Sequence, residues 1–366
     1  MKVAVACGGT GGHIFPGLAT ADALHERGHD VTLWLAGKDV ETPALKSWTG
    51  RLITVPSEGL PSGFSLRTVR ALWRILRAVR ECRRIMKVEQ PDVLLAMGSY
   101  ASVGPVAAAL SRRVPVVLHE ANVLPGRAIA LFAKRATAVA ASFEESRFYL
   151  KRKEIVITGM PIRKELEAAA GRARPADVNR NLFTVLVMGG SRGAHRLNDV
   201  VSAALAQIHK LGHKIQVIHL TGVADEEAVR KVYADAGVPA RVHAFSSDMA
   251  SIYAVTDLAI CRSGAATCGE LAVFAVPALL VPYPFAARDH QMANARALEK
   301  DGAADVVPER DLGVAWLMDY VAGCMSDSGR LARMSASARS RAPGSAAVRL
   351  AELVIQVGKR NDGQHP

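Results

Sequence analysis

Short apolar runs alternate along the chain with longer segments in which apolar residues recur at helical spacing. Most runs are continuous stretches of Val, Ile, Leu and Ala, which is typical of parallel strands covered on both faces. In the first half, strands are predicted at residues 2–6, 31–36, 92–97, 115–118, 137–141 and 154–158. In the second half, strands are predicted at residues 183–188, 215–220, 241–245, 257–261, 278–282 and 304–307. This alternation with helices predicts an α/β fold with two parallel-sheet units.

A polar, Ala- and Arg-rich stretch without an apolar period, residues 167–181, separates the two halves. Each half opens with a strand, a glycine turn and a helix, as VAVACGGTGGH and again as VLVMGGSRGAH. Two Rossmann-like domains facing one cleft are therefore expected, with ligands outside the carboxyl ends of the strands. The predicted parts are an N-terminal domain, a linker, a C-terminal domain, and a final helix that packs back toward the N-terminal domain and ends in a frayed tail: residues 1–163, 164–181, 182–340 and 341–366.

The first glycine turn, GGTGGHIFPG at residues 8–17, fits neither common phosphate loop. A dinucleotide fingerprint that began at Gly9 would need glycine where Ile14 stands, and neither glycine turn supplies the lysine of a P-loop. Glycines still allow close approach, and the free N–H groups of the following helix attract anions. The turn therefore predicts phosphate binding, or a tight turn without a ligand. The loop MGSYASVGP, residues 97–105, repeats the pattern.

Three further polar segments follow predicted strands. CRSGAATCGE, residues 261–270, offers a helix N-terminus for a phosphate, and Glu270 either binds ribose hydroxyls or caps the helix. HEAN, residues 119–122, offers His and Glu as a base, an orienting group or structural polar groups. DHQMAN, residues 289–294, offers amides suited to sugar hydroxyls.

The composition of the 366 residues is globular, with 50% apolar and 22% charged residues, and the net charge of +12 points to an anionic partner. Residues 66–87 carry eight Arg or Lys and one Glu, a net charge of +7. Helical spacing puts four arginines on one face and Trp73 near its border, as in a helix on an anionic membrane surface: Arg67, Arg70, Arg74 and Arg77. The alternative is a helix packed on its own sheet. Nucleic acid is disfavoured because no binding motif accompanies the charge.

Several classes of protein do not fit the sequence. Five scattered cysteines without a C-x-x-C pair argue against a disulfide framework or a zinc site. No D-x-D occurs, so a nucleotide diphosphate held through a metal is not expected, and no metal or other cofactor is predicted to be required. The apolar window 271–287 contains three prolines, and the first apolar run is short, so neither a membrane span nor a signal peptide is expected.

Six motifs occur in the order GGTGGHIFPG, HEAN, GMPIR, GGSRGA, CRSGA and DHQMANA, from residue 8 to residue 295. Together they resemble the MurG family of peptidoglycan N-acetylglucosaminyltransferases, and the resemblance runs from Met1 to about residue 355. It implies a GT-B fold and an inverting transfer from UDP-N-acetylglucosamine (UDP-GlcNAc) to the 4-hydroxyl of the muramic acid sugar in lipid I, giving lipid II. It also implies a peripheral enzyme on the cytoplasmic face of the bacterial inner membrane, with cell-wall synthesis proteins as possible partners.

The resemblance also implies roles for single residues. Thr10, Gly11 and Gly12 would lie at the donor and acceptor phosphates, and Asn122 at the donor sugar. The donor diphosphate would neighbour Arg163 and Ser191, and the backbone of Ser246 would meet the uracil. Glu270 would bind the ribose and Gln291 the hydroxyls of N-acetylglucosamine. The nucleotide would be cradled by Ala265, Ala266, Thr267, Cys268, Gly269 and Glu270.

The chain departs from the family in two loops. It has T-C-G-E at residues 267–270, where a second small hydroxyl residue is usual, and G-S-Y at residues 98–100, where G-G-Y is frequent. The first departure affects one nucleotide hydrogen bond, and the second affects the flexibility of the acceptor loop.

The catalytic base and the reaction class each have alternatives. His13, in the first turn of a helix, is the candidate base, and Glu120 is the alternative if His13 instead binds phosphate or positions the acceptor. The competing functions are a UDP-GlcNAc 2-epimerase, a glycolipid synthase of the same fold, or a non-enzymatic protein that binds a nucleotide sugar or a polyprenyl phosphate.

Overall fold

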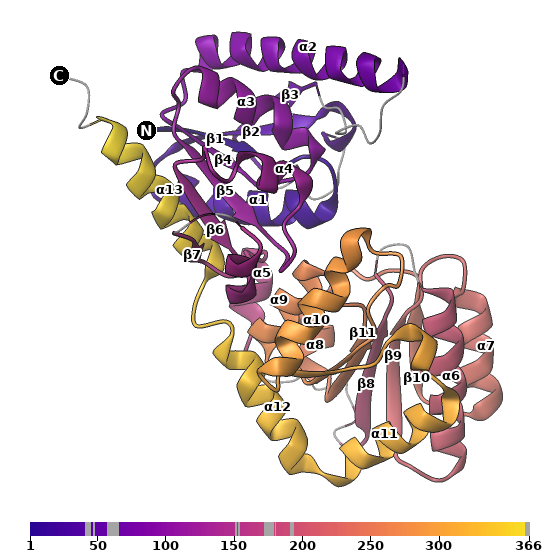
Figure 1. Ribbon diagram of the computed structural model, residues 1–366. Coiled ribbons are helices and arrows are strands. Elements are labelled where there is room, and N and C mark those ends of the chain that lie inside the picture. The colour runs from indigo at the N-terminus through magenta and orange to yellow at the C-terminus, as the bar shows by residue number, and fades with distance from the viewer. Residues whose placement is uncertain are drawn as a thin grey trace. The chain divides into compact units, whose positions relative to one another are not determined.

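The computed structural model describes the whole chain except residues 41–44, 47, 57–65, 151, 153, 172–178, 180, 191–193 and 363–366. The chain forms two compact units (Figure 1). Unit 1 consists of residues 1–163 together with 344–366, and unit 2 consists of residues 164–343. The last segment of the chain therefore belongs to the same unit as the first.

Unit 1 is built on a seven-stranded parallel sheet with the strand order β3-β2-β1-β4-β5-β6-β7. The order reverses between β1 and β4, the place in a doubly wound sheet where a ligand crevice opens. The strands are β1 (Lys2–Ala6), β2 (Asp30–Ala36), β3 (Arg51–Val55), β4 (Val93–Ala96), β5 (Val116–Glu120), β6 (Ala138–Ala141) and β7 (Val156–Ile157).

Helices cover both faces of this sheet. Successive residues of β1 enter opposite cores: Val3 and Val5 pack with α1 and α13, whereas Ala4 and Ala6 pack with α2, α3 and α4. The α-helices are α1 (Gly11–His25), α2 (Leu66–Glu89), α3 (Val103–Ser111), α4 (Arg127–Phe132) and α13 (Ala346–Asp362). Short 3₁₀ helices are η1 (Gly37–Asp39), η3 (Tyr100–Ser102) and η4 (Glu144–Phe148). Burial on both faces accounts for the continuous apolar runs of the strands.

Unit 2 has a six-stranded parallel sheet with the order β10-β9-β8-β11-β12-β13. Its strands are β8 (Phe183–Met188), β9 (Ile215–Leu220), β10 (Ala240–His243), β11 (Leu258–Cys261), β12 (Ala278–Leu280) and β13 (Ala304–Val306). Its α-helices are α5 (Lys164–Ala169), α6 (His195–Lys210), α7 (Glu226–Ala236), α8 (Met249–Val255), α9 (Ala265–Phe274), α10 (His290–Lys300), α11 (Val314–Ser326) and α12 (Ser328–Ser340). Two 3₁₀ helices are η5 (Ala287–Asp289) and η6 (Glu309–Asp311).

The prediction of two parallel-sheet α/β units is confirmed, and each predicted strand coincides with an observed one. Strand β3, Arg51–Val55, was not predicted. It lies at the edge of its sheet, and only Val55 is buried, so the strand lacks the continuous apolar run used to find the others. The range expected to be the linker, 164–181, begins with helix α5.

Candidate functional site

The first glycine turn follows β1 at the carboxyl edge of the unit 1 sheet. A side chain at Gly8 would place its Cβ 2.7 Å from the backbone nitrogen of Ala36, and Gly9 has a φ of +119°. The Gly9 N–H donates to Oδ2 of Asp39 at 2.6 Å, and the Ser99 hydroxyl donates to the Gly8 carbonyl at 2.6 Å. These contacts require glycine at both positions and fix the turn that leads into α1.

His13 lies in the first turn of α1, where it is half-buried beside the exposed Thr10. Its Nδ1 is 2.9 Å from Oγ1 of Thr10, and burial lowers the pKa of the imidazole to about 4. His119, at the end of β5, is fully buried and its Nε2 donates to the Gly159 carbonyl at 3.1 Å. Burial, together with the nearby His13, lowers the pKa of His119 to about 4. Both rings are therefore neutral near pH 7.

Glu120 is buried, and its carboxylate binds backbone N–H groups of the loop between β5 and α4. Its Oε1 accepts the N–H of Asn122 at 2.8 Å, and its Oε2 accepts the N–H of Gly126 at 2.8 Å. Burial raises its pKa to about 7, against the opposing effect of these N–H donors. The carboxylate thus holds Asn122 and the turn before α4 in place, which favours a structural role over that of the base. Arg163, at the end of unit 1, lies over the Phe15 ring of α1 at 5.1 Å.

The second glycine turn follows β8 in unit 2, where Gly190 has a φ of +92°. Ser191, expected at the donor diphosphate, lies outside the described residues. Ser246 follows β10 and is half-buried, and its hydroxyl accepts the N–H of Asp248 at 3.2 Å.

Helix α9 begins directly after β11 and carries the expected nucleotide cradle. Ser263, just before the helix, donates to the Gln291 carbonyl at 2.8 Å, and Asn294 donates to the Ser263 carbonyl at 3.1 Å. The Gln291 side-chain oxygen accepts the N–H of Tyr283 at 3.0 Å. One turn into α9, Glu270 is half-buried and its Oε2 accepts a hydrogen bond from a tyrosine hydroxyl. The segments 261–270 and 289–294 are therefore joined to one another in unit 2.

Arg262 is a supporting residue of this site that sequence reasoning missed. Its buried guanidinium donates to the carbonyls of Val281 at 3.0 Å and Pro282 at 3.2 Å, and it pairs with Glu309. It thereby ties the loop after β12 to the end of β11. The available signal was an arginine placed directly after an apolar strand, in CRSGA.

The basic helix α2 packs through a narrow apolar stripe. Ala78, Cys82 and Met86 are buried against the core that includes α3. At 100° per residue, the opposite face carries Trp73 and Leu76, which are 63% and 64% exposed, together with cations. Those exposed cations are Arg77, Arg80, Arg84 and Lys87. Arg74 is also exposed, and the side chains of Arg67 and Arg70 lie outside the described part of the structure.

In the part of the chain that the structure describes, no helix is long and apolar enough to cross a membrane. Across the same residues, no group of three or more His, Cys, Asp or Glu side chains is arranged to hold a metal ion.

Two Rossmann-like units, each with a glycine turn after the first strand of its parallel sheet, are the architecture of the GT-B class of nucleotide-sugar enzymes. Residues 3–141 match the glycosyltransferase family 28 N-terminal domain, and residues 184–361 match the glycosyltransferase family 28 C-terminal domain. The chain belongs to glycosyltransferase family 28.

Curated relatives match over nearly their full length. The chain is 33% identical to the UDP-N-acetylglucosamine–N-acetylmuramyl-(pentapeptide) pyrophosphoryl-undecaprenol N-acetylglucosamine transferase of Geobacter sulfurreducens, over 99% of this chain and 100% of the relative. It is 38% identical to the enzyme of the same name from Acidithiobacillus ferrooxidans, over 97% of each chain.

Solved structures share the fold. A crystal structure of Acinetobacter baumannii MurG superposes with a TM-score of 0.79 at 29% identity, over 97% of this chain and 100% of that one. A UDP-N-acetylglucosamine 2-epimerase from Listeria monocytogenes superposes with a TM-score of 0.70 at 12% identity, over 100% of this chain and 97% of that one, which is a likeness of fold alone.

Proposed function

We propose that this protein transfers N-acetylglucosamine from UDP-GlcNAc to the 4-hydroxyl of the muramic acid sugar of undecaprenyl-pyrophosphoryl-MurNAc-pentapeptide. The product is lipid II, a precursor of peptidoglycan. The observation that carries this proposal is the end-to-end similarity to transferases of that name. The first glycine turn and the N-terminus of α9 support it.

Unit 2 binds the donor. The N-terminal turn of α9, Ala265–Thr267, directs backbone N–H groups at the diphosphate, and Glu270, one turn further, accepts hydrogen bonds from the ribose hydroxyls. Gln291 contacts the hydroxyls of the transferred sugar, and its backbone is fixed by Ser263. Fixed N–H dipoles stabilise the negative charge that develops on the leaving UDP, so that no metal is required. Turnover is expected to persist in EDTA.

Unit 1 binds the acceptor and carries the base. The acceptor diphosphate lies on the N-terminal turn of α1 at Thr10, Gly11 and Gly12. His13 accepts the proton of the 4-hydroxyl while that oxygen attacks C1 of the donor sugar and the bond from C1 to UDP breaks, which inverts C1. An imidazole with a pKa of about 4 is unprotonated at pH 7, and the bound diphosphate raises its basicity.

The outward face of α2 holds the enzyme on the cytoplasmic face of the membrane. Trp73 and Leu76 enter the interface between headgroups and acyl chains, and the surrounding arginines attract anionic lipids. This places unit 1 at the surface on which the polyprenyl-linked acceptor is anchored.

The decisive experiment incubates the purified chain with UDP-GlcNAc and a short-chain lipid I analogue, and measures both UDP and the disaccharide product. Equal amounts of the two products, each dependent on the acceptor, are expected. A 2-epimerase would convert UDP-GlcNAc without the acceptor, and a binding protein would release no UDP. Either result would overturn the proposal.

A further inference from the structure

Tyr253, in α8, is joined to the carboxylate of Glu270. Its hydroxyl donates to Oε2 of Glu270 at 2.8 Å. The tyrosine side chain is 2% exposed, and burial together with the adjacent carboxylate raises its pKa well above the usual value. The phenol therefore keeps its proton throughout the physiological pH range. Glu270 is its close acceptor, whereas the Met188 sulfur lies 3.9 Å from the same hydroxyl.

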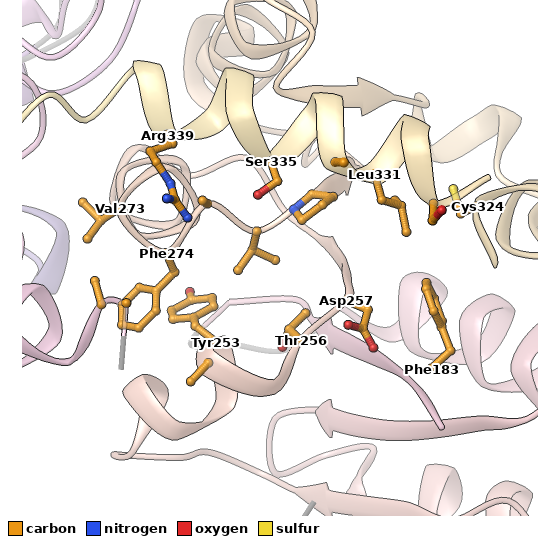
Figure 2. Close-up of a pocket in the computed structure, with 18 of the residues that line it drawn as sticks. Phe183, Tyr253, Thr256, Asp257, Val273, Phe274, Cys324, Leu331, Ser335 and Arg339 are labelled. Atoms are coloured by element: carbon orange, nitrogen blue, oxygen red, sulfur yellow. The ribbon is translucent and has the colours of Figure 1, made fainter. Parts of the chain in front are cut away.

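The Tyr253 ring has a fixed position behind the nucleotide cradle. It packs against Phe274, at the end of α9, with ring centroids 5.1 Å apart and planes inclined by 35°. Figure 2 shows the two rings side by side at one end of a cavity whose other lining residues include Phe183 and Asp257. Because Phe183 and Asp257 lie at the starts of β8 and β11, this cavity is at the amino edge of the unit 2 sheet. Tyr253 thus reaches Glu270 from the side opposite to the donor.

We infer that Tyr253 is a positioning residue for donor binding, which sets the carboxylate of Glu270 toward the ribose. A glutamate side chain has three rotatable bonds, and the last of them is broad and weakly restrained. A hydrogen bond to one oxygen from a ring that cannot move fixes that torsion and therefore fixes the direction of the other oxygen. The donor then binds a carboxylate that is already oriented, so less conformational entropy is lost on binding.

This inference rests on the proposed function, because it requires Glu270 to bind the ribose. Replacing Tyr253 with Phe removes the hydroxyl oxygen and keeps the ring and its packing against Phe274. The effect should appear in the binding of any uridine diphosphate, whether or not an acceptor is present. It should not appear in the chemical step, because Tyr253 contacts neither the reacting carbon nor the base.

The test compares Tyr253→Phe with Tyr233→Phe in the full-length protein. Tyr233 is the matched control: it is 1% exposed, and its hydroxyl lies 3.0 Å from Nδ1 of His219, in the core between α7 and the sheet. Calorimetry gives the Kd for UDP, and steady-state assays give the KM for UDP-GlcNAc and kcat. We expect Tyr253→Phe to raise the Kd and the KM by about 5- to 10-fold, with kcat changed by less than about 2-fold. Tyr233→Phe should leave all three unchanged.

A double-mutant cycle with Glu270→Ala separates positioning from general damage. Glu270→Ala alone should weaken UDP binding by more than about 10-fold, and adding Tyr253→Phe should then have less than about a 2-fold effect. Equal effects of Tyr253→Phe in both backgrounds, or wild-type UDP binding by Tyr253→Phe, would overturn the inference. If Glu270→Ala binds UDP as tightly as the wild type, Glu270 does not contact the ribose, and the inference is overturned as well. Failure of the proposed function has a different signature, because the wild-type chain itself would then give no acceptor-dependent release of UDP.

Discussion

Each unit is proposed to hold a diphosphate at the carboxyl edge of its parallel sheet, but the chemistry around the two positions differs. In unit 1, burial has moved the pKa values of three titratable groups: those of His13 and His119 down and that of Glu120 up. In unit 2, the α9 cradle is supported by fixed charges and neutral donors, namely the Arg262–Glu309 pair and the hydroxyl of Tyr253.

This difference separates two tasks. A group that accepts a proton in catalysis must be able to change its protonation state, and the groups proposed for that role, His13 and Glu120, belong to unit 1. Unit 2 has a titratable group after its own glycine turn, because His195 bonds to Asp225, which raises the pKa of the imidazole. A site that binds the donor in one fixed geometry is better supported by groups whose charge does not change with pH. We therefore expect changes in unit 1 to alter kcat and the pH dependence, and changes in unit 2 to alter donor affinity and local stability.

The largest expected effect comes from His13→Ala. Loss of the base should lower kcat by about 10²- to 10⁴-fold, the usual contribution of a positioned general base. The Kd for UDP should change little, because most of the proposed nucleotide contacts are in α9 of unit 2. Steady-state kinetics with the lipid I analogue and calorimetry with UDP measure the two quantities on the same preparation. Near-normal turnover by this variant would show that His13 is not the base. Proton transfer would then no longer be assigned to His13 of unit 1.

Arg262→Met should mainly destabilise unit 2. The substitution keeps most of the apolar volume but leaves the Glu309 carboxylate without its buried partner, at a cost of about 3 kcal/mol or more. Chemical unfolding followed by fluorescence gives the change in stability. Arg296→Met is a suitable control, since its pair with Glu299 lies on an exposed surface and should contribute less than about 1 kcal/mol. Similar losses in the two variants would show that the Arg262 pair is no more than a surface contact.

The next largest effect is expected on membrane binding through the outward face of α2, the face that carries Trp73 and Leu76. Replacing Arg77, Arg80 and Lys87 with Gln removes three exposed cations and leaves the buried stripe intact. At about 1 kcal/mol per cation near an anionic surface, sedimentation with phosphatidylglycerol vesicles should weaken by about 100-fold. Zwitterionic vesicles provide the control and should show little difference between the variant and the wild type. Unchanged binding to the anionic vesicles would leave α2 as a helix that serves only to pack on its own unit.

The pH dependence of stability tests the buried imidazoles of unit 1. The pKa of His119 is 6.5 in the unfolded chain and about 4 in the fold, so the unfolded state takes up the proton first as pH falls. Stability is therefore lost from about pH 6.5 down to pH 4, and between pH 6.5 and 5 this one residue accounts for about 2 kcal/mol. Glu120, with its raised pKa, contributes in the opposite sense: its stabilisation is present at low pH and is lost as pH rises through about 7.

His119→Gln isolates the histidine, because an amide can still donate to the Gly159 carbonyl. Urea unfolding at pH 7 and pH 5 should show a smaller acid-induced loss in this variant than in the wild type, by about 2 kcal/mol. The same slope in both proteins would mean that His119 does not remain neutral in the folded chain.

The sequence predicted what depends on local pattern and left out what depends on tertiary contact. Continuous apolar runs revealed the buried strands, and the glycines after β1 and β8 marked where those strands end. The edge strand β3 was missed because its half-exposed residues carry no such run. The partners Tyr253 and Glu309 were missed because they lie 17 and 47 residues from Glu270 and Arg262, and only the fold brings them together. The motif HEAN likewise did not predict that Glu120 accepts hydrogen bonds from backbone N–H groups.

The smallest expected effect concerns Ser99, which stands where the family frequently has glycine. Its φ of +64° lies in the left-handed region, at a cost of about 1 kcal/mol, and its hydroxyl repays this by bonding to the Gly8 carbonyl and accepting the Ala101 N–H. Ser99→Ala keeps the strain and loses both bonds, so it should destabilise unit 1 by about 1 kcal/mol or slightly more. Ser99→Gly loses the bonds but also the strain, and should lie closer to the wild type.

Thermal unfolding of the two variants measures the difference between them, which is the strain relieved by glycine less the extra conformational entropy that glycine gives the unfolded chain. A lower midpoint for Ser99→Gly would mean that the left-handed backbone at residue 99 costs less than that entropy. If Ser99→Gly is the more stable of the two but raises the KM for the acceptor while Ser99→Ala does not, the rigidity of this loop is itself part of acceptor binding. That result would extend the contrast between the two units. Acceptor binding in unit 1 would then depend on a backbone conformation that is unfavourable for Ser99, whereas the proposed donor site in unit 2 depends on hydrogen bonds between side chains.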